Sequence, residues 1–140
     1  MAIDNGRLKH LEIVQQVITR MATNSFFLKG WSVTLLSAIL AIAVKEGLYR
    51  MVAISFLPFL MFWILDGYFL HQERLYRKLW DRLRVEEQET PTNFSMNTAE
   101  VAQEVTSWFG VIFSKTLLLF HGVLLAVLVV IVVFTFCLRG

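Results

Sequence analysis

The stretch from residue 26 to residue 84 most constrains the fold, because it contains two long apolar runs separated by a short turn near Gly47. Each run has about 20 mostly apolar residues, the length that an α-helix needs to cross the hydrocarbon core of a membrane. After Gly67 no glycine or proline interrupts the charged segment that follows the second run. The sequence therefore predicts a transmembrane hairpin over residues 26–70 that continues into a helical stem.

Two opposite charges lie within this hairpin, Lys29 in the first span and Asp66 in the second. They stand at nearly equal distances in sequence from Gly47, so an antiparallel hairpin brings them to the same depth. An unpaired charge in lipid costs about 3 kcal/mol on insertion scales, which favours a pairing of the two side chains. An ion pair that fixes helix register is one interpretation. The other is that one of them lines a pore or a ligand vestibule.

The composition agrees with a membrane protein. The chain has 140 residues, of which 56% are hydrophobic, and its mean hydropathy is +0.60. A soluble domain of this size is less apolar, so we expect lipid to cover much of the surface. The formal net charge of +2 is too small to indicate a nucleic-acid-binding protein by itself.

Residues 1–25 are predicted to form a cytoplasmic amphipathic helix. Apolar residues recur there at steps of three and four, among them Leu8, Leu11 and Val14, with charged and amide side chains between them. This helix can lie on the inner membrane surface or pack against the stem, and the mixed charges favour the stem. Thr23, Asn24 and Ser25 would then cap the next helix or form a polar joint.

Each predicted span of the hairpin has a distinguishing feature. The first presents small residues on one face, Gly30, Thr34, Ser37 and Ala41, which either pack closely against another helix or supply a weakly polar pore wall. The second contains Pro58, which frees a backbone carbonyl and can kink the helix.

Residues 71–107 are predicted to form a cytoplasmic helical stem and a linker. Near-heptad spacing indicates a helix that packs in a bundle and makes the stem an oligomerisation element; the residues are Phe62, Leu65, Phe69, Gln72, Tyr76, Leu79 and Leu83. The stem also has an excess of cations, which are Arg74, Arg77, Lys78, Arg82 and Arg84. By the positive-inside rule these cations place the stem and the N-terminus in the cytoplasm.

The rest of the chain is a linker and a third span. Residues 86–97 are polar and contain Pro91, so they predict a loop, and a helix is expected to begin over residues 95–104. The third transmembrane segment is expected over residues 108–138, with its apolar core at 117–136 and a short tail outside. Lys115 lies at its cytoplasmic start. His121 either bonds to a neighbouring helix or has a pore-facing, proton-responsive gating role.

The sequence has no pattern typical of an enzyme. It contains no phosphate-binding glycine loop, no metal-ligand spacing and no Ser/His/Asp arrangement, and its three histidines are far apart. We therefore expect neither catalysis nor a cofactor or bound metal.

Three segments resemble a family of small bacterial membrane proteins: ITRMATNSFFLKGWSVTLLSAI, FWILDGYFLHQERLYRKLWD and SWFGVIFSKTLLLFHG. The arrangement of helical spans with a charged stem resembles that of the small transmembrane effectors and accessory proteins of nucleotide-signalled anti-phage systems. It most resembles the Hailong-type channel effectors, and next the RADAR membrane accessory subunits. The resemblance implies an oligomeric inner-membrane ion channel, held shut by a DNA oligomer that a partner nucleotidyltransferase makes and opened during infection.

Two functions follow from these features. In the first, a symmetric ring of protomers, for which a tetramer is favoured, encloses a pore in which Lys29, Asp66, Lys115 and His121 form rings of charge near the cytoplasmic mouth. The stem cations would then bind an anionic ligand such as a nucleotide or single-stranded DNA, with Tyr76 and Trp80 as stacking faces. In the second, the chain conducts nothing and anchors a soluble partner to the membrane through its cytoplasmic helices.

Overall fold

The computed structural model describes residues 5–46, 49–85 and 93–137, which form helices and connecting segments without any β-strand. The elements are α1 (Asn5–Lys45), α2 (Tyr49–Ile54), α3 (Phe56–Val85), the 3-10 helix η1 (Ala99–Glu104), α4 (Trp108–Ile112) and α5 (Lys115–Cys137). Three helical stretches are long and apolar enough to span a membrane: Asn5–Lys45, Met51–Val85 and Lys115–Thr135. The predicted all-α architecture with three candidate spans is therefore confirmed.

Helix α1 is one uninterrupted rod, which differs from the two helices expected on either side of residue 25. Thr23, Asn24 and Ser25 lie inside this helix and begin no new one, so the cap interpretation is wrong. Ser25 is buried, and its hydroxyl donates a hydrogen bond to Asp66 of α3 instead of binding the backbone of a helix terminus. A polar triplet thus marks an interhelical contact here.

The second predicted span is divided near Pro58, as the sequence indicated, but the break lies one turn earlier. Ser55 forms a turn between α2 and α3, and its hydroxyl donates to the carbonyl of Val52 at 2.5 Å. Proline has no N–H group and its ring crowds the preceding turn, so the carbonyl of Ile54 loses its usual helical donor. Beyond this break α3 continues to Val85, so the charged segment after Gly67 is helical. The predicted turn at Gly47 lies outside the described residues.

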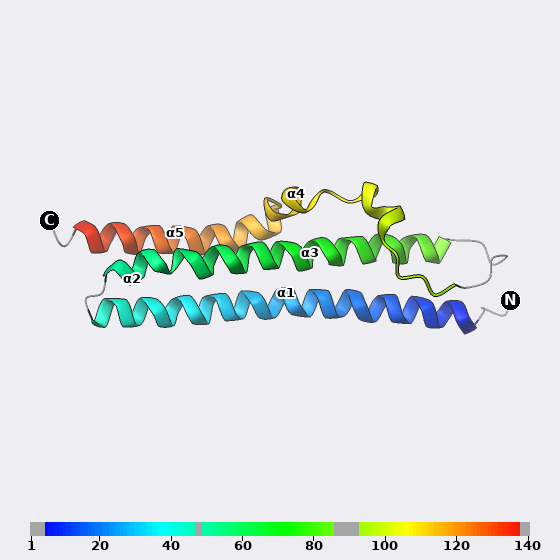
Figure 1. Ribbon diagram of the computed structural model, residues 1–140, viewed down its shortest axis with the longest axis horizontal. Coiled ribbons are helices and arrows are strands. Elements are labelled where there is room, and N and C mark those ends of the chain that lie inside the picture. The colour runs from blue at the N-terminus through cyan, green and yellow to red at the C-terminus, as the bar shows by residue number, and fades with distance from the viewer. Residues whose placement is uncertain (1–4, 47–48, 86–92, 138–140) are drawn as a thin grey trace.

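Helices α1 and α3 run antiparallel side by side over most of the molecule, and α5 lies along the half of α3 nearest α2 (Figure 1). Two apolar clusters hold this arrangement together. In the stem half, Val14 and Ile18 of α1 pack with Leu79 of α3 and Val101 of η1. In the other half, a second cluster joins the three candidate spans through Leu36, Phe59 and Leu128. The N-terminal part of α1 therefore packs on the stem, the favoured of its two predicted placements.

The segment between α3 and α5 folds back over the stem half of the molecule (Figure 1). Residues 93–98 have no regular structure, and the helix expected over residues 95–104 is a 3-10 helix that begins at Ala99. A separate short helix, α4, follows, and the hydroxyl of Ser107 caps it by accepting a hydrogen bond from the backbone N–H of Gly110. The first part of the predicted loop, with Pro91, and the tail from residue 138 lie outside the described residues.

Candidate functional site

A buried carboxylate connects all three candidate spans. Asp66 of α3 has no exposed surface, and its Oδ2 atom lies 2.6 Å from Nζ of Lys29 on α1 and 3.0 Å from Nε2 of His121 on α5. The hydroxyl of Ser25 donates to the other carboxylate oxygen, Oδ1. These four residues are called the polar cluster below. The predicted ion pair between Lys29 and Asp66 is confirmed, and so is a hydrogen bond from His121 to a neighbouring helix.

The local sequence explains why α1 can reach Asp66 with two side chains. Ser25 and Lys29 are one helical turn apart, so they lie on the same face of α1. Nζ of Lys29 donates to Oγ of Ser25 at 2.8 Å, which orients both groups toward the carboxylate. On α3, Gly67 follows Asp66 and permits the close approach of Ile112 on α4. The cluster therefore forms where four elements meet.

Aromatic rings surround the imidazole of His121. Trp63 stacks on it, with ring centroids 5.6 Å apart and planes 10° from parallel. Phe59 and Phe120 meet the imidazole edge-on at 6.1 and 5.1 Å between centroids. The Nδ1 atom of His121 is buried and has no hydrogen-bond partner among the described residues. His121 thus has one nitrogen on the carboxylate and one in apolar surroundings.

Of the four residues predicted to act in a pore or gate, three come together and one does not. Lys29, Asp66 and His121 form the polar cluster, whereas Lys115 is exposed at the first residue of α5 and no polar contact joins it to the cluster in the described structure. Asp66 and His121 are 0% and 1% exposed, so within the protomer their side chains face its interior. The arrangement suits a group that ties helices together.

The small-residue face of α1 is not used inside the protomer. Gly30, Thr34, Ser37 and Ala41 are all exposed, and a Cβ atom built on Gly30 would meet no other atom within 4 Å. Thr34 satisfies its hydroxyl by donating to the carbonyl of Gly30 at 3.0 Å. This face is therefore open to another chain, to lipid or to a pore.

Four of the predicted ligand-binding cations of the stem have acidic or aromatic neighbours, and these four are Arg77, Lys78, Arg82 and Arg84. Arg77 pairs with Glu73 at 2.7 Å, and Arg82 lies 3.3 Å from Glu100 of η1. Arg84 lies over the ring of Trp80, with its guanidinium carbon 5.2 Å from the ring centroid. The side chains of Arg77 and Arg82 are 61% and 46% exposed, so each of these ion pairs contributes at most about 1 kcal/mol.

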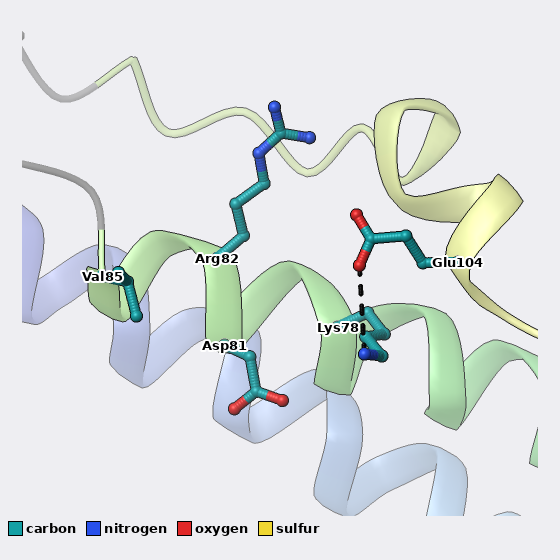
Figure 2. A pocket seen from close by; sticks show the side chains of 5 residues that line it. All are labelled: Lys78, Asp81, Arg82, Val85 and Glu104. Atoms are coloured by element: carbon teal, nitrogen blue, oxygen red, sulfur yellow. Dashed lines mark ion pairs between the residues drawn. The ribbon is translucent and has the colours of Figure 1, made fainter.

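Two hollows separate the stem from the segment that folds over it. One, of about 420 Å³, is lined by Lys78, Asp81, Arg82, Val85 and Glu104. Figure 2 shows Lys78 and Glu104 facing each other across it, with 3.9 Å between Nζ and Oε2, while Asp81 points toward α1. The second hollow, of about 260 Å³, adds Arg74 and Arg77 from the stem and Val105 and Thr106 from the linker. All the predicted stem cations except Arg84 line one of these hollows.

The sequence alone does not identify several residues of the polar cluster and of the hollows beside the stem. The residue type of Ser25 indicates a cap or joint, although its spacing of four from Lys29 places the two side chains on one helix face. Glu73 was visible at the i,i+4 spacing from Arg77. Glu100 and Glu104 share a spacing of four, but nothing in the sequence indicates which helix they face. Their position on the stem comes from the tertiary fold alone.

The described residues contain no group of three or more His, Cys, Asp or Glu side chains placed to hold a metal ion. No family profile, no curated protein and no solved structure matches this chain.

Proposed function

We propose that the chain is a homo-oligomeric ion channel of the bacterial inner membrane that acts as an effector of anti-phage defence. In this proposal an anionic ligand at the stem, a nucleotide or a single-stranded DNA oligomer, holds the channel closed, and its release depolarises the membrane. The observation that carries the channel proposal is the polar cluster, in which one buried carboxylate ties three candidate spans together. The defence role and the DNA ligand rest on the resemblance.

Oligomerisation is needed because three helices cannot enclose a pore, whereas a closed ring of protomers can. The open face of α1, which contains Gly30 and Thr34, supports a contact or pore lining between protomers. The heptad face of the stem supports it less, since Tyr76, Leu79 and Leu83 already pack within the protomer against α1 and η1. We therefore assign the interprotomer contact to α1, and we favour a tetramer.

The geometry of the polar cluster supports a role in gating. Intramembrane charges are stable only when they are paired, so a movement that separates Lys29 from Asp66 must supply another partner for each. Two discrete arrangements of the spans result, one with the cluster closed and one with it open. A ligand that binds one arrangement better shifts the population toward it.

The ligand site would be formed by the hollows between stem and linker. An incoming phosphate could contact Arg74, Arg77 and Lys78, but it must compete with Glu73, Glu100 and Glu104 for the stem cations. Binding therefore requires that the linker segment move away from the stem. Strong salt dependence is expected, because each phosphate contact releases counterions.

Recording from the purified chain in planar lipid bilayers tests the proposal. We expect discrete current steps that a mixed-sequence single-stranded DNA oligomer reduces. K78E/R82E should conduct, lose DNA binding and lose the response to DNA, whereas E100Q/E104Q should bind DNA more tightly because its cations are released. K45E is the matched control, since Lys45 is an exposed cation at the far end of α1. Unchanged DNA binding by K78E/R82E would count against the site.

A membrane scaffold is the second candidate, and the pairing of the stem cations favours it. Because Arg77, Lys78 and Arg82 each have a carboxylate neighbour, the stem surface is less positive than its composition indicates. Such a surface suits a protein partner that presents both positive and negative side chains. The same recordings distinguish the two candidates. A scaffold passes no current in any condition, and such a result would overturn the channel proposal.

A further inference from the structure

Two potential cations share one carboxylate oxygen in the polar cluster. Oδ2 of Asp66 lies 2.6 Å from Nζ of Lys29 and 3.0 Å from Nε2 of His121. Asp66 carries a single negative charge, so it can balance only one of them. A second positive charge in this buried place would be uncompensated, and such a charge is costly inside a membrane.

The cluster is neutral when Lys29 is an ammonium and His121 is an uncharged imidazole that donates its Nε2–H to Asp66. In that tautomer the Nδ1 atom of His121 has a free lone pair. Nδ1 is buried and has no hydrogen-bond partner among the described residues. It can therefore accept a proton without displacing a hydrogen bond of the cluster.

The rings around His121 are suited to a cationic imidazole. Trp63 lies parallel to it at 5.6 Å, within the range in which the face of an indole attracts a cation. The Lys29 side chain can leave the cluster, since it is 22% exposed and its ammonium nitrogen lies 5.8 Å from the ring centroid of Phe120. A long lysine side chain near the end of a transmembrane helix can extend toward the membrane–water interface.

We propose that the polar cluster is a proton-binding site in which His121 and Lys29 compete for Asp66. A proton from water binds Nδ1 of His121, and the resulting imidazolium keeps its Nε2–H bond to Oδ2 and replaces Lys29 as the counter-ion of Asp66. The Lys29 ammonium leaves Oδ2 and moves to the interface. The pair of Asp66 and His121 is then neutral, the proton taken up adds one positive charge, and Lys29 holds that charge at the interface. The ion pair between α1 and α3 is released, whereas the bond from Ser25 to Asp66 remains.

Few other charged groups face this site. Helix α1 contributes Lys29, α3 contributes Asp66, and α5 itself has Lys115, which is exposed one and a half turns before His121. Helix α4 has no ionisable residue, and the described side chains of α2, residues 51–54, are apolar. Within the described structure the competition is therefore between His121 and Lys29.

Histidine NMR on the full chain tests this site directly. The protein is labelled with 15N-histidine in nanodiscs of phosphatidylethanolamine and phosphatidylglycerol, and the His121 signals are assigned by their loss in H121Q. We expect a neutral Nε2–H tautomer at pH 8 and a doubly protonated ring at acid pH. K29Q removes the competing cation, so its His121 ring should already be doubly protonated under acid conditions in which the wild-type ring is still neutral.

K115Q is the matched control, because it removes a lysine from the same region that does not contact Asp66. It should leave the protonation of His121 as it is in the wild type. A His121 ring that stays neutral from pH 8 to pH 5 would overturn the site, and so would the same protonation of the ring in the wild type and K29Q at every pH. The readout is spectroscopic, so it is independent of whether the chain conducts ions.

Discussion

The ammonium nitrogen of Lys29 lies 2.6 Å from a carboxylate oxygen of Asp66, so a cation of α1 and an anion of α3 meet in the interior of the protomer. Asp66 is fully buried, and Ser25 and His121 complete its hydrogen bonds. The energetic consequence is asymmetric. Removing one member of a buried ion pair leaves the other charge uncompensated, whereas removing both members leaves no uncompensated charge.

We therefore expect Asp66→Asn to destabilise the protein by about 3–5 kcal/mol, because Ser25, Lys29 and His121 lose their shared charged acceptor. The double variant D66N/K29Q should be less destabilised than the sum of its two single variants. Unfolding of the purified protein in detergent micelles gives these free energies, and K115Q serves as the control. Strict additivity of the two changes would show that the pair makes no energetic contribution.

The contact of α3 with α4 predicts a second effect. A Cβ atom added at Gly67 would lie 2.6 Å from Cγ1 of Ile112, which is itself buried. Gly67→Ala should therefore destabilise the protein by about 1–3 kcal/mol through overpacking. Gly122→Ala is the matched control, since nothing lies within 4 Å of a Cβ atom at that helical position. We expect this control to be neutral or slightly stabilising, as alanine is the better helix former. Equal stabilities of the two variants would contradict the close approach.

The open face of α1 predicts a separation of folding from assembly. Gly30→Leu adds a large side chain where the protomer has free space, so the helical content and stability of the protomer should be kept. If this face joins protomers, the variant should shift the oligomer toward monomer, because a leucine prevents the close approach of two helices. Mass measurement by light scattering in detergent checks this expectation. An unchanged mass would remove α1 as the interface.

The apolar cluster of the stem predicts that the N-terminal half of α1 depends on α3. Leu79 is 7% exposed and packs with Val14 and Ile18, so Leu79→Ala should cost about 2–5 kcal/mol. Hydrogen exchange should increase in residues 5–20 of this variant. Val85→Ala is the control on the same helix, because Val85 is 75% exposed. Exchange that stays slow in L79A would show that α1 holds its position without this cluster.

Hairpin geometry explains which contacts the sequence could predict. The pairing of Lys29 with Asp66 followed from their equal separation from one turn, a relation that depends only on helix rise. The bond from His121 to another span followed from the cost of an unpartnered polar group in lipid. That both meet at the same oxygen could not be predicted, because the sequence does not fix the rotation of α5 against α3.

Local patterns failed where tertiary contacts override them. The triplet Thr23–Ser25 has the residue types of a helix cap, yet α1 continues through it because Ser25 finds its partner on α3. The excess of cations after the second span predicts a basic stem surface, but Glu100 and Glu104 approach these cations from a distant segment. Ring size, ligand and sidedness are properties of an assembly in a membrane, and they stay predictions.

The continuity of α1 has a mechanical consequence. At about 1.5 Å per residue its 41 residues form a rod of about 60 Å, roughly twice the thickness of a hydrocarbon core. The contact of Lys29 with Asp66 lies near the middle of this rod. Because apolar clusters also hold α1 on either side of this contact, a displacement of its N-terminal arm is carried along the stiff helix to the arm among the candidate spans.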